Sequence, residues 1–272
     1  MFQLIRLFVT GAAFCLGYAA VPARTEGAAC PSELRDSLLR AQPSEDRPIE
    51  INCDLVLEPD DVIEQPIAFS GAKASGSTLD CRGATLRGKS GNGRRTVLIR
   101  SIKRSDGSWD VPRDITIRNC MIKGDLRIQG LGRNGEAEEV RLSSLEAGHT
   151  QRAKAAAPSK LRLSNIQFVA TGTIPLYVAP GVTGTTVEAS RFSGHTSATA
   201  IYLDAETAGN RILGNRFDIS TTWREMIAVD GSANNRIEDN IFEEPIKGGV
   251  FLYRNCGEGG TIRHQAPQRN VI

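Results

Sequence analysis

The stretch "NRILGNRF" at residues 210–217 returns as "NRIEDNIF" at residues 235–242, and this repeat decides the fold. The two copies end in Phe residues that are 25 positions apart. Similar segments stand upstream as "LRLSNIQF" at residues 161–168 and "TTVEASRF" at residues 185–192. A short repeated unit cannot bury a core alone, so the units must stack on one another.

The spacing and residue types of the repeat favour stacked parallel strands over other repeat folds. Each copy is followed by a second β-branched segment, as in "AIYLDA" at residues 200–205 and "MIAVDG" at residues 226–231. Leucine-rich repeats need a denser Leu consensus and propeller blades need longer repeats. In a coiled parallel sheet, Phe192, Phe217 and Phe242 stack at roughly 4.8 Å, the spacing of neighbouring strands.

This pattern resembles the right-handed parallel β-helix superfamily, which includes pectate-lyase-like proteins and alginate epimerases. The resemblance covers residues 49–272 and implies an all-β fold, an exported protein and a polysaccharide partner. It does not imply one chemistry, because many activities share the architecture. The Asp-Pro-His-Asp motif of alginate epimerases is absent from the chain. The stretch "YRNCGEGGTIRHQ" is similar to a segment of exported bacterial β-helix proteins whose function is poorly defined.

The sequence outside the repeat predicts three further regions. Residues 1–23 carry a basic start and a short apolar run, as an export signal does, so we expect a periplasmic or extracellular protein with no membrane anchor after cleavage. Residues 24–48 form an N-terminal cap with an amphipathic helix at residues 31–42. Residues 130–160 interrupt the repeat, and we expect a long loop with one strand at "EVRLSS". The final "RNVI" matches the start of another "NRI" strand, which suggests that C-terminal coils are missing.

Cysteine usage and charge limit the partners. Removal of the export signal leaves five cysteines, and we predict Cys30–Cys53 and Cys81–Cys120 as disulfides with Cys256 unpaired. No cysteine pair has zinc-like spacing, so we expect no metal and no cofactor. A bound calcium ion stays open as an alternative, although nothing in the sequence indicates one. The 33 basic and 31 acidic side chains nearly cancel, which argues against nucleic acid. Oligomeric state stays open.

A polar stretch, "FLYRNCGEGGTIRHQ" at residues 251–265, interrupts the repeat by about ten residues. Departures from a regular scaffold are where sites are built. Asp204 and Asp230 end equivalent strands, so their side chains form a column whose next member is Tyr253 or Arg254. We expect these four residues and His264 to converge on one face.

Our leading hypothesis is a lyase or epimerase that acts on an acidic glycan. Arg254 or Arg263 would neutralise a uronate carboxylate, His264 or Tyr253 would move the proton, and Asp230 would assist. We assign substrate binding to Asp204, Glu258, Arg263 and Gln265. Trp109 and Trp223 are aromatic groups that can stack on sugar rings.

Two other functions remain open, as does a purely structural explanation of the polar residues. The chain can be a noncatalytic glycan-binding or structural module, or a glycoside hydrolase that uses Asp204 and Asp230 as its paired carboxylates. Each Asp can instead be a turn former, and Arg254 can pair with them as part of a structural ion network.

Overall fold

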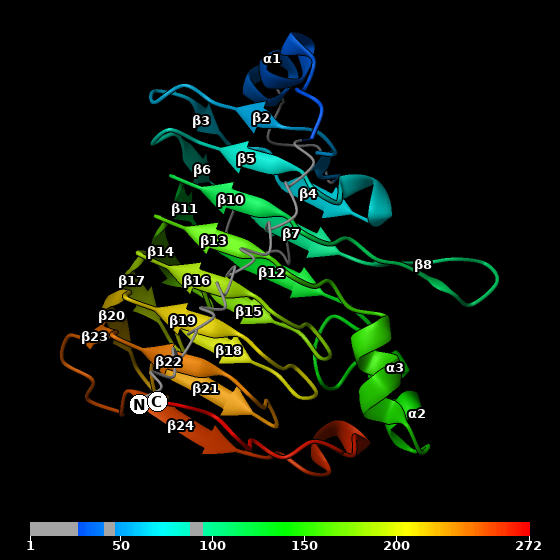
Figure 1. Cartoon of the computed structure of the whole chain (residues 1–272). Helices are drawn as coiled ribbons and strands as arrows, with labels where there is room; N and C mark the ends of the chain where they lie inside the picture. The colour runs from blue at the N-terminus through cyan, green and yellow to red at the C-terminus, as the bar shows by residue number, and fades with distance from the viewer. Residues whose placement is uncertain (1–26, 41–46, 88–94) are drawn as a thin grey trace, which may run out of the picture.

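A computed structural model describes residues 27–40, 47–87 and 95–272, and it shows a parallel β-helix. Each coil gives one strand to each of three parallel sheets, and the coils stack along one axis (Figure 1). The all-β fold predicted from the repeat is therefore confirmed. The export signal predicted at residues 1–23 lies outside the described residues.

The sheets are numbered in the order in which the chain passes through them within one coil. The first sheet contains β1 (Ile49–Glu50), β4 (Ile67–Ser70), β7 (Val97–Arg100), β12 (Leu126–Gln129), β15 (Leu176–Val178), β18 (Ile201–Leu203), β21 (Ile227–Asp230) and β24 (Val250–Tyr253). The second sheet contains β2 (Leu55–Val56), β5 (Thr78–Asp80), β10 (Thr116–Arg118), β13 (Arg162–Ser164), β16 (Thr186–Glu188), β19 (Arg211–Leu213) and β22 (Arg236–Glu238). The third sheet contains β3 (Val62–Ile63), β6 (Thr85–Arg87), β11 (Met121–Lys123), β14 (Gln167–Gly172), β17 (Arg191–Thr196), β20 (Arg216–Thr221) and β23 (Ile241–Phe242).

The core is a set of side-chain ladders that run along the stack. Phe168, Phe192, Phe217 and Phe242 stand in register in the third sheet, and successive ring centroids are 4.6, 4.7 and 4.9 Å apart. The first three are fully buried. The Phe ladder predicted from the repeat is thus confirmed, and each ring fills the space that its neighbours leave.

Asn side chains bridge the coils at a turn of each repeat. The backbone N–H of Asn210 donates to Asn235 Oδ1 at 2.9 Å, and that of Asn235 donates to Asn270 Oδ1 at the same distance. Arg236 also forms a β-bridge with Val271. The final "RNVI" therefore does begin another coil in register, after a detour of ten extra residues.

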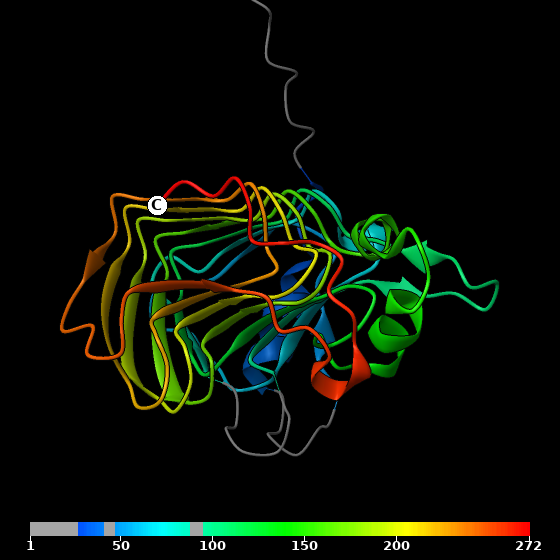
Figure 2. The same ribbon diagram turned by 90° about the horizontal axis from the view of Figure 1, so that it is seen from below.

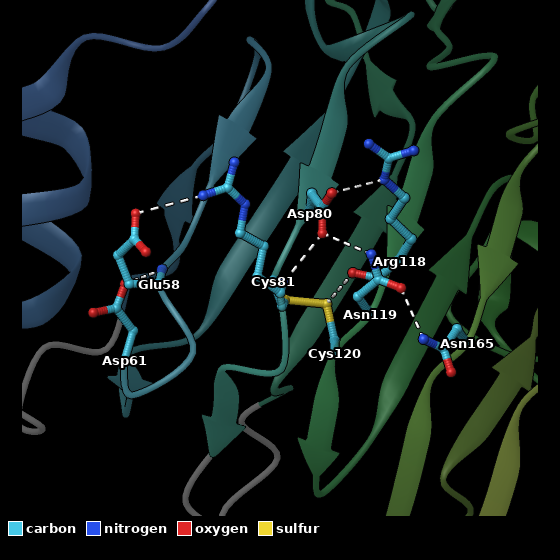
Figure 3. Close-up of a disulfide and its surroundings, with 9 residues drawn as sticks. Glu58, Asp61, Asp80, Cys81, Arg118, Asn119, Cys120 and Asn165 are labelled. Atoms are coloured by element: carbon cyan, nitrogen blue, oxygen red, sulfur yellow. Dashed lines mark hydrogen bonds and ion pairs between the residues drawn. A yellow bond between two sulfur atoms is a disulfide. The ribbon is translucent and has the colours of Figure 1, made fainter.

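The N-terminal end of the stack is covered, as predicted, by helix α1 (Ser32–Arg40), whose Leu38 is buried in the core (Figure 1). The predicted disulfide Cys30–Cys53 ties this cap to the first coil. The second predicted disulfide, Cys81–Cys120, joins neighbouring coils beside a cluster in which Arg118 and Asn119 donate to Asp80 (Figure 3). Cys256 is unpaired, as predicted, and its side chain is exposed.

Four excursions leave the stack at one corner, between the first and the second sheet. They are η1 (Ala72–Ala74), the antiparallel hairpin of β8 (Ile102–Lys103) and β9 (Trp109–Asp110), the insertion with α2 (Glu138–Ser144) and α3 (His149–Ala155), and a segment that includes η2 (Glu258–Gly260). Figures 1 and 2 show the hairpin, the two helices and η2 on the same side of the molecule. No helix of the described residues is long and apolar enough to span a membrane.

The insertion corrects one prediction, because "EVRLSS" is not a strand. It lies in α2, which buries Val140 and Ser144, while α3 buries His149 and Ala153. Both pairs are four residues apart, which places them on one face of a helix. Trp109 and a small apolar cluster around Val140 pack beneath these helices.

Candidate functional site

The last strand of the first sheet settles which residue continues the Asp column. In β24, Val250 and Leu252 pair with the buried Ile227 and Val229, so the strand turns Tyr253 to the outer face. Tyr253 is the register partner of Asp230. Arg254 follows the strand and is exposed. Of the two alternatives for the next member of the column, the structure selects Tyr253.

Arg263, not Arg254, is the cation of the Asp column. Arg263 Nη2 lies 3.8 Å from Asp204 Oδ1 and 3.9 Å from Asp230 Oδ2, and its Nη1 donates to the Gly135 carbonyl at 2.9 Å. All three charged residues are at most 2% exposed. A Cβ on Gly135 would come within 2.5 Å of the guanidinium, so this close approach needs glycine. The expected role of Arg254 at the column is therefore corrected.

Both carboxylates accept further hydrogen bonds, so that each oxygen of Asp204 and Asp230 has at least one donor. Gly135 N–H and Ala205 N–H donate to Asp204 at 2.8 and 2.7 Å, and the Tyr177 hydroxyl also donates to it. Asp230 accepts from the Tyr202 hydroxyl at 3.0 Å and from Asn255 N–H at 2.9 Å. Burial raises the pKa of Asp204 to about 6 in spite of the Arg263 charge beside it.

The remaining polar residues of the "FLYRNCGEGGTIRHQ" stretch hold the segment down rather than face the column. We call residues 254–265 the strap. His264 does not fold over Asp230 as expected, because its Nε2–H donates to the Ser144 carbonyl at 2.8 Å and its ring lies 5.1 Å from that of His149. The Arg254 guanidinium donates to the Arg263 carbonyl. Glu258 is exposed on η2.

A buried carboxylate joins the strap to the insertion. Glu206 accepts from the backbone N–H groups of His264 and Gln265 at 2.7 and 3.1 Å, and from the Thr150 hydroxyl of α3. Lys154 of α3 donates to Gln265 Oε1 at 2.8 Å. Glu206 has a φ of 62°, in the left-handed region that disfavours such a residue. That strain is consistent with a carboxylate held in place to clamp two segments.

Beside Tyr253, the outer face of the first sheet carries two Tyr and two Arg side chains that were not predicted as site residues. Tyr177 and Tyr202 are register partners and stack at 5.2 Å, with Arg127 over the first ring at 4.7 Å. Arg224 lies 5.3 Å from the Tyr253 ring centroid and contacts its hydroxyl, which also donates to Glu225 at 3.2 Å. Burial raises the pKa of Tyr253, so its hydroxyl is a donor at neutral pH.

A cleft opens beside the insertion, at the corner shared by the excursions. Its volume is about 510 Å³, and it lies between the ends of β7 and β12, the β8–β9 hairpin and the start of α2. We call it the corner cleft. Trp109, Ser101 and Gln129 line it. The Ser101 hydroxyl is buried and has no hydrogen-bond partner among the described residues, which is costly unless a ligand or solvent group reaches it.

A second cleft of about 430 Å³ lies on the third sheet near the last coil, where Arg216 and Asp218 are already engaged in ion pairs with Glu243 and Arg191. Within the described ranges, no group of three or more His, Cys, Asp or Glu residues is placed to hold a metal ion. The corner cleft is therefore the better candidate site, since it combines an aromatic wall with an unsatisfied polar group.

Comparisons with known proteins give no family. No protein-family model matches the chain, and no curated protein matches it in sequence. Among solved structures, a match is the crystal structure of a "putative glycosyl hydrolase" from Parabacteroides merdae, which is 12% identical, with 78% of this chain and 84% of that chain covered. The TM-score is 0.28, too low for the match to carry an argument about fold or activity.

Proposed function

We propose that this chain is an exported β-helix protein that binds a glycan in the corner cleft. The observation that carries the proposal is the pairing of Trp109 with the orphan Ser101 hydroxyl in one cleft. A sugar presents an apolar C–H face, which packs against an indole ring, and hydroxyl groups, which bond to a polar group such as Ser101. The cleft volume lies within the range of small-ligand sites.

The burial of the Asp column favours binding over catalysis. Asp204 and Asp230 are buried under Arg263 and the strap, so a glycan cannot reach either carboxylate without displacement of that segment. This burial weighs against a hydrolase that uses the pair.

The two disulfides fit an oxidising compartment, which supports export.

The test uses the two tryptophans of the chain as a matched pair. Trp109 lines the cleft, whereas Trp223 is 76% exposed on a turn outside it. In a glycan-panel screen followed by calorimetry, Trp109→Ala should weaken binding at least about tenfold, the usual effect of removing an interface aromatic, while Trp223→Ala should not. Ser101→Ala serves as a second, smaller change in case Trp109→Ala loosens the fold. Binding that neither cleft variant alters would overturn the proposal.

Lyase or epimerase chemistry on an acidic glycan is a second candidate, and one observation favours it. On the outer face of the first sheet, the Tyr253 hydroxyl contacts the Arg224 guanidinium, and Tyr253 is partly exposed. A Tyr hydroxyl that stays protonated can give a proton as general acid, and an Arg beside it can face a substrate carboxylate. If it occurs, oligouronate incubated with the protein should yield unsaturated or epimerised product, detected by ultraviolet absorbance or NMR, and Tyr253→Phe should abolish it. If no product forms, this second candidate fails and glycan binding without catalysis remains the proposed function.

A further inference from the structure

The charges around the corner cleft are not balanced once existing ion pairs are set aside. Arg100 is engaged by Glu50, with Nη2 to Oε1 at 3.1 Å. Glu138 is engaged by Arg141 of its own helix at 2.7 Å. Within the described part of the chain, the lining charges that show no ion pair are Arg133, Glu136 and Glu139. The net charge of these three residues is therefore one negative charge.

The groups that face the cleft suit a cation better than an anion. A uronate carboxylate would meet Glu136 and Glu139 with only Arg133 to offset them. A protonated amine would be attracted by both carboxylates and by the Trp109 ring, whose face is negative. Ser101 is 8% exposed as a residue, and its buried hydroxyl has no partner among the described residues, so it can accept a hydrogen bond from an amine that reaches it.

We infer that the corner cleft recognises a glycan that carries a free, protonated amine, such as a glucosamine unit, in preference to a uronate. This inference rests on the proposed glycan binding and names its ligand class. It departs from the acidic glycan expected from sequence. Because the amine must be charged, affinity falls as pH rises through the amine's own pKa.

The experiment measures binding of three oligosaccharides by calorimetry: a chitosan oligomer with free amines, its fully N-acetylated counterpart, and an oligogalacturonate. The chitosan oligomer should bind at least about tenfold more tightly than the N-acetylated one, since acetylation removes the ion pairs and the cation–π contact. Glu136→Gln and Glu139→Gln should each weaken chitosan binding by about two- to fivefold, the range for exposed ion pairs. The control is Glu146→Gln, an exposed carboxylate of the insertion outside the cleft lining, which should have no effect.

The outcomes separate this inference from the function on which it rests. Equal binding of the free and acetylated oligomers, with loss in Trp109→Ala, would keep glycan binding and overturn the amine preference. Tighter binding of oligogalacturonate would overturn it as well. If none of the three sugars binds in a manner that depends on Trp109, glycan binding at the cleft fails and the amine preference fails with it.

Discussion

Replacement of Arg263 by Met tests whether the polar stretch at residues 251–265 is a structural clamp. The guanidinium lies 3.8 and 3.9 Å from two carboxylates that are at most 1% exposed, and it is itself 2% exposed. Removal of one partner of a buried ion pair leaves an uncompensated charge, which typically costs about 3–5 kcal/mol. Met has a similar length and no charge, so the loss should come from electrostatics rather than from a cavity.

The assay is urea unfolding at pH 7.5 and at pH 5, with Arg236→Met as the control. Arg236 forms an ion pair with Glu238 on the surface, so its loss should cost about 0–1 kcal/mol. The Arg263→Met defect should shrink at pH 5, because the unpaired Asp204 then takes up a proton. Addition of Asp230→Asn should restore part of the stability. A loss below about 1 kcal/mol at pH 7.5 would refute the clamp, and would reopen the Asp column as a site whose scaffold does not depend on it.

Three further predictions concern the scaffold. Phe217→Ala should cost about 3–5 kcal/mol of unfolding free energy, the range for a buried Phe, whereas Phe251→Ala, at a half-exposed position, should cost far less; equal losses would mean that the ladder is not the core. The pKa of Asp204 is raised from 3.8 to about 6, so the folded state binds this proton more tightly, and unfolding free energy should fall by up to about 3 kcal/mol between pH 4 and pH 6.5, relative to Asp204→Asn, in calorimetric scans. Alkylation without reduction should label Cys256 and spare the two disulfides, and peptide mapping that finds Cys256 in a disulfide would contradict the structure.

The fold was predictable because individual core residues recur at a fixed spacing in the sequence. Phe192, Phe217 and Phe242 recur at a fixed spacing, and each occupies the same register position. The two disulfides followed from an odd cysteine count and from position along the chain. The insertion was misjudged because a short amphipathic segment can be read with either period, and only its packing against the stack reveals helix α2.

The candidate site was less predictable, because it depends on how the excursions fold back. The stacking of Asp204 on Asp230 followed from the repeat, but the repeat ends before the strap, and nothing local shows that Arg263 rather than Arg254 turns inward. Tyr177 and Tyr202 stand at equivalent positions of "LYV" and "IYL", a signal that the repeat did contain. The orphan hydroxyl of Ser101 has no sequence signature, since it arises from the meeting of β7, the hairpin and the insertion.

The contacts between the strap and the insertion join distant parts of the chain, so they can form only late in synthesis. Arg263 reaches back 128 residues to Gly135, and His264 reaches back 120 residues to Ser144. A ribosome-bound chain can stack its early coils as they emerge, because each coil needs only its neighbour. The contacts of helices α2 and α3 with the strap cannot form until residues 254–265 have left the ribosome. We therefore expect a chain truncated before residue 255 to be cut by proteases within residues 130–160, where the full-length chain resists.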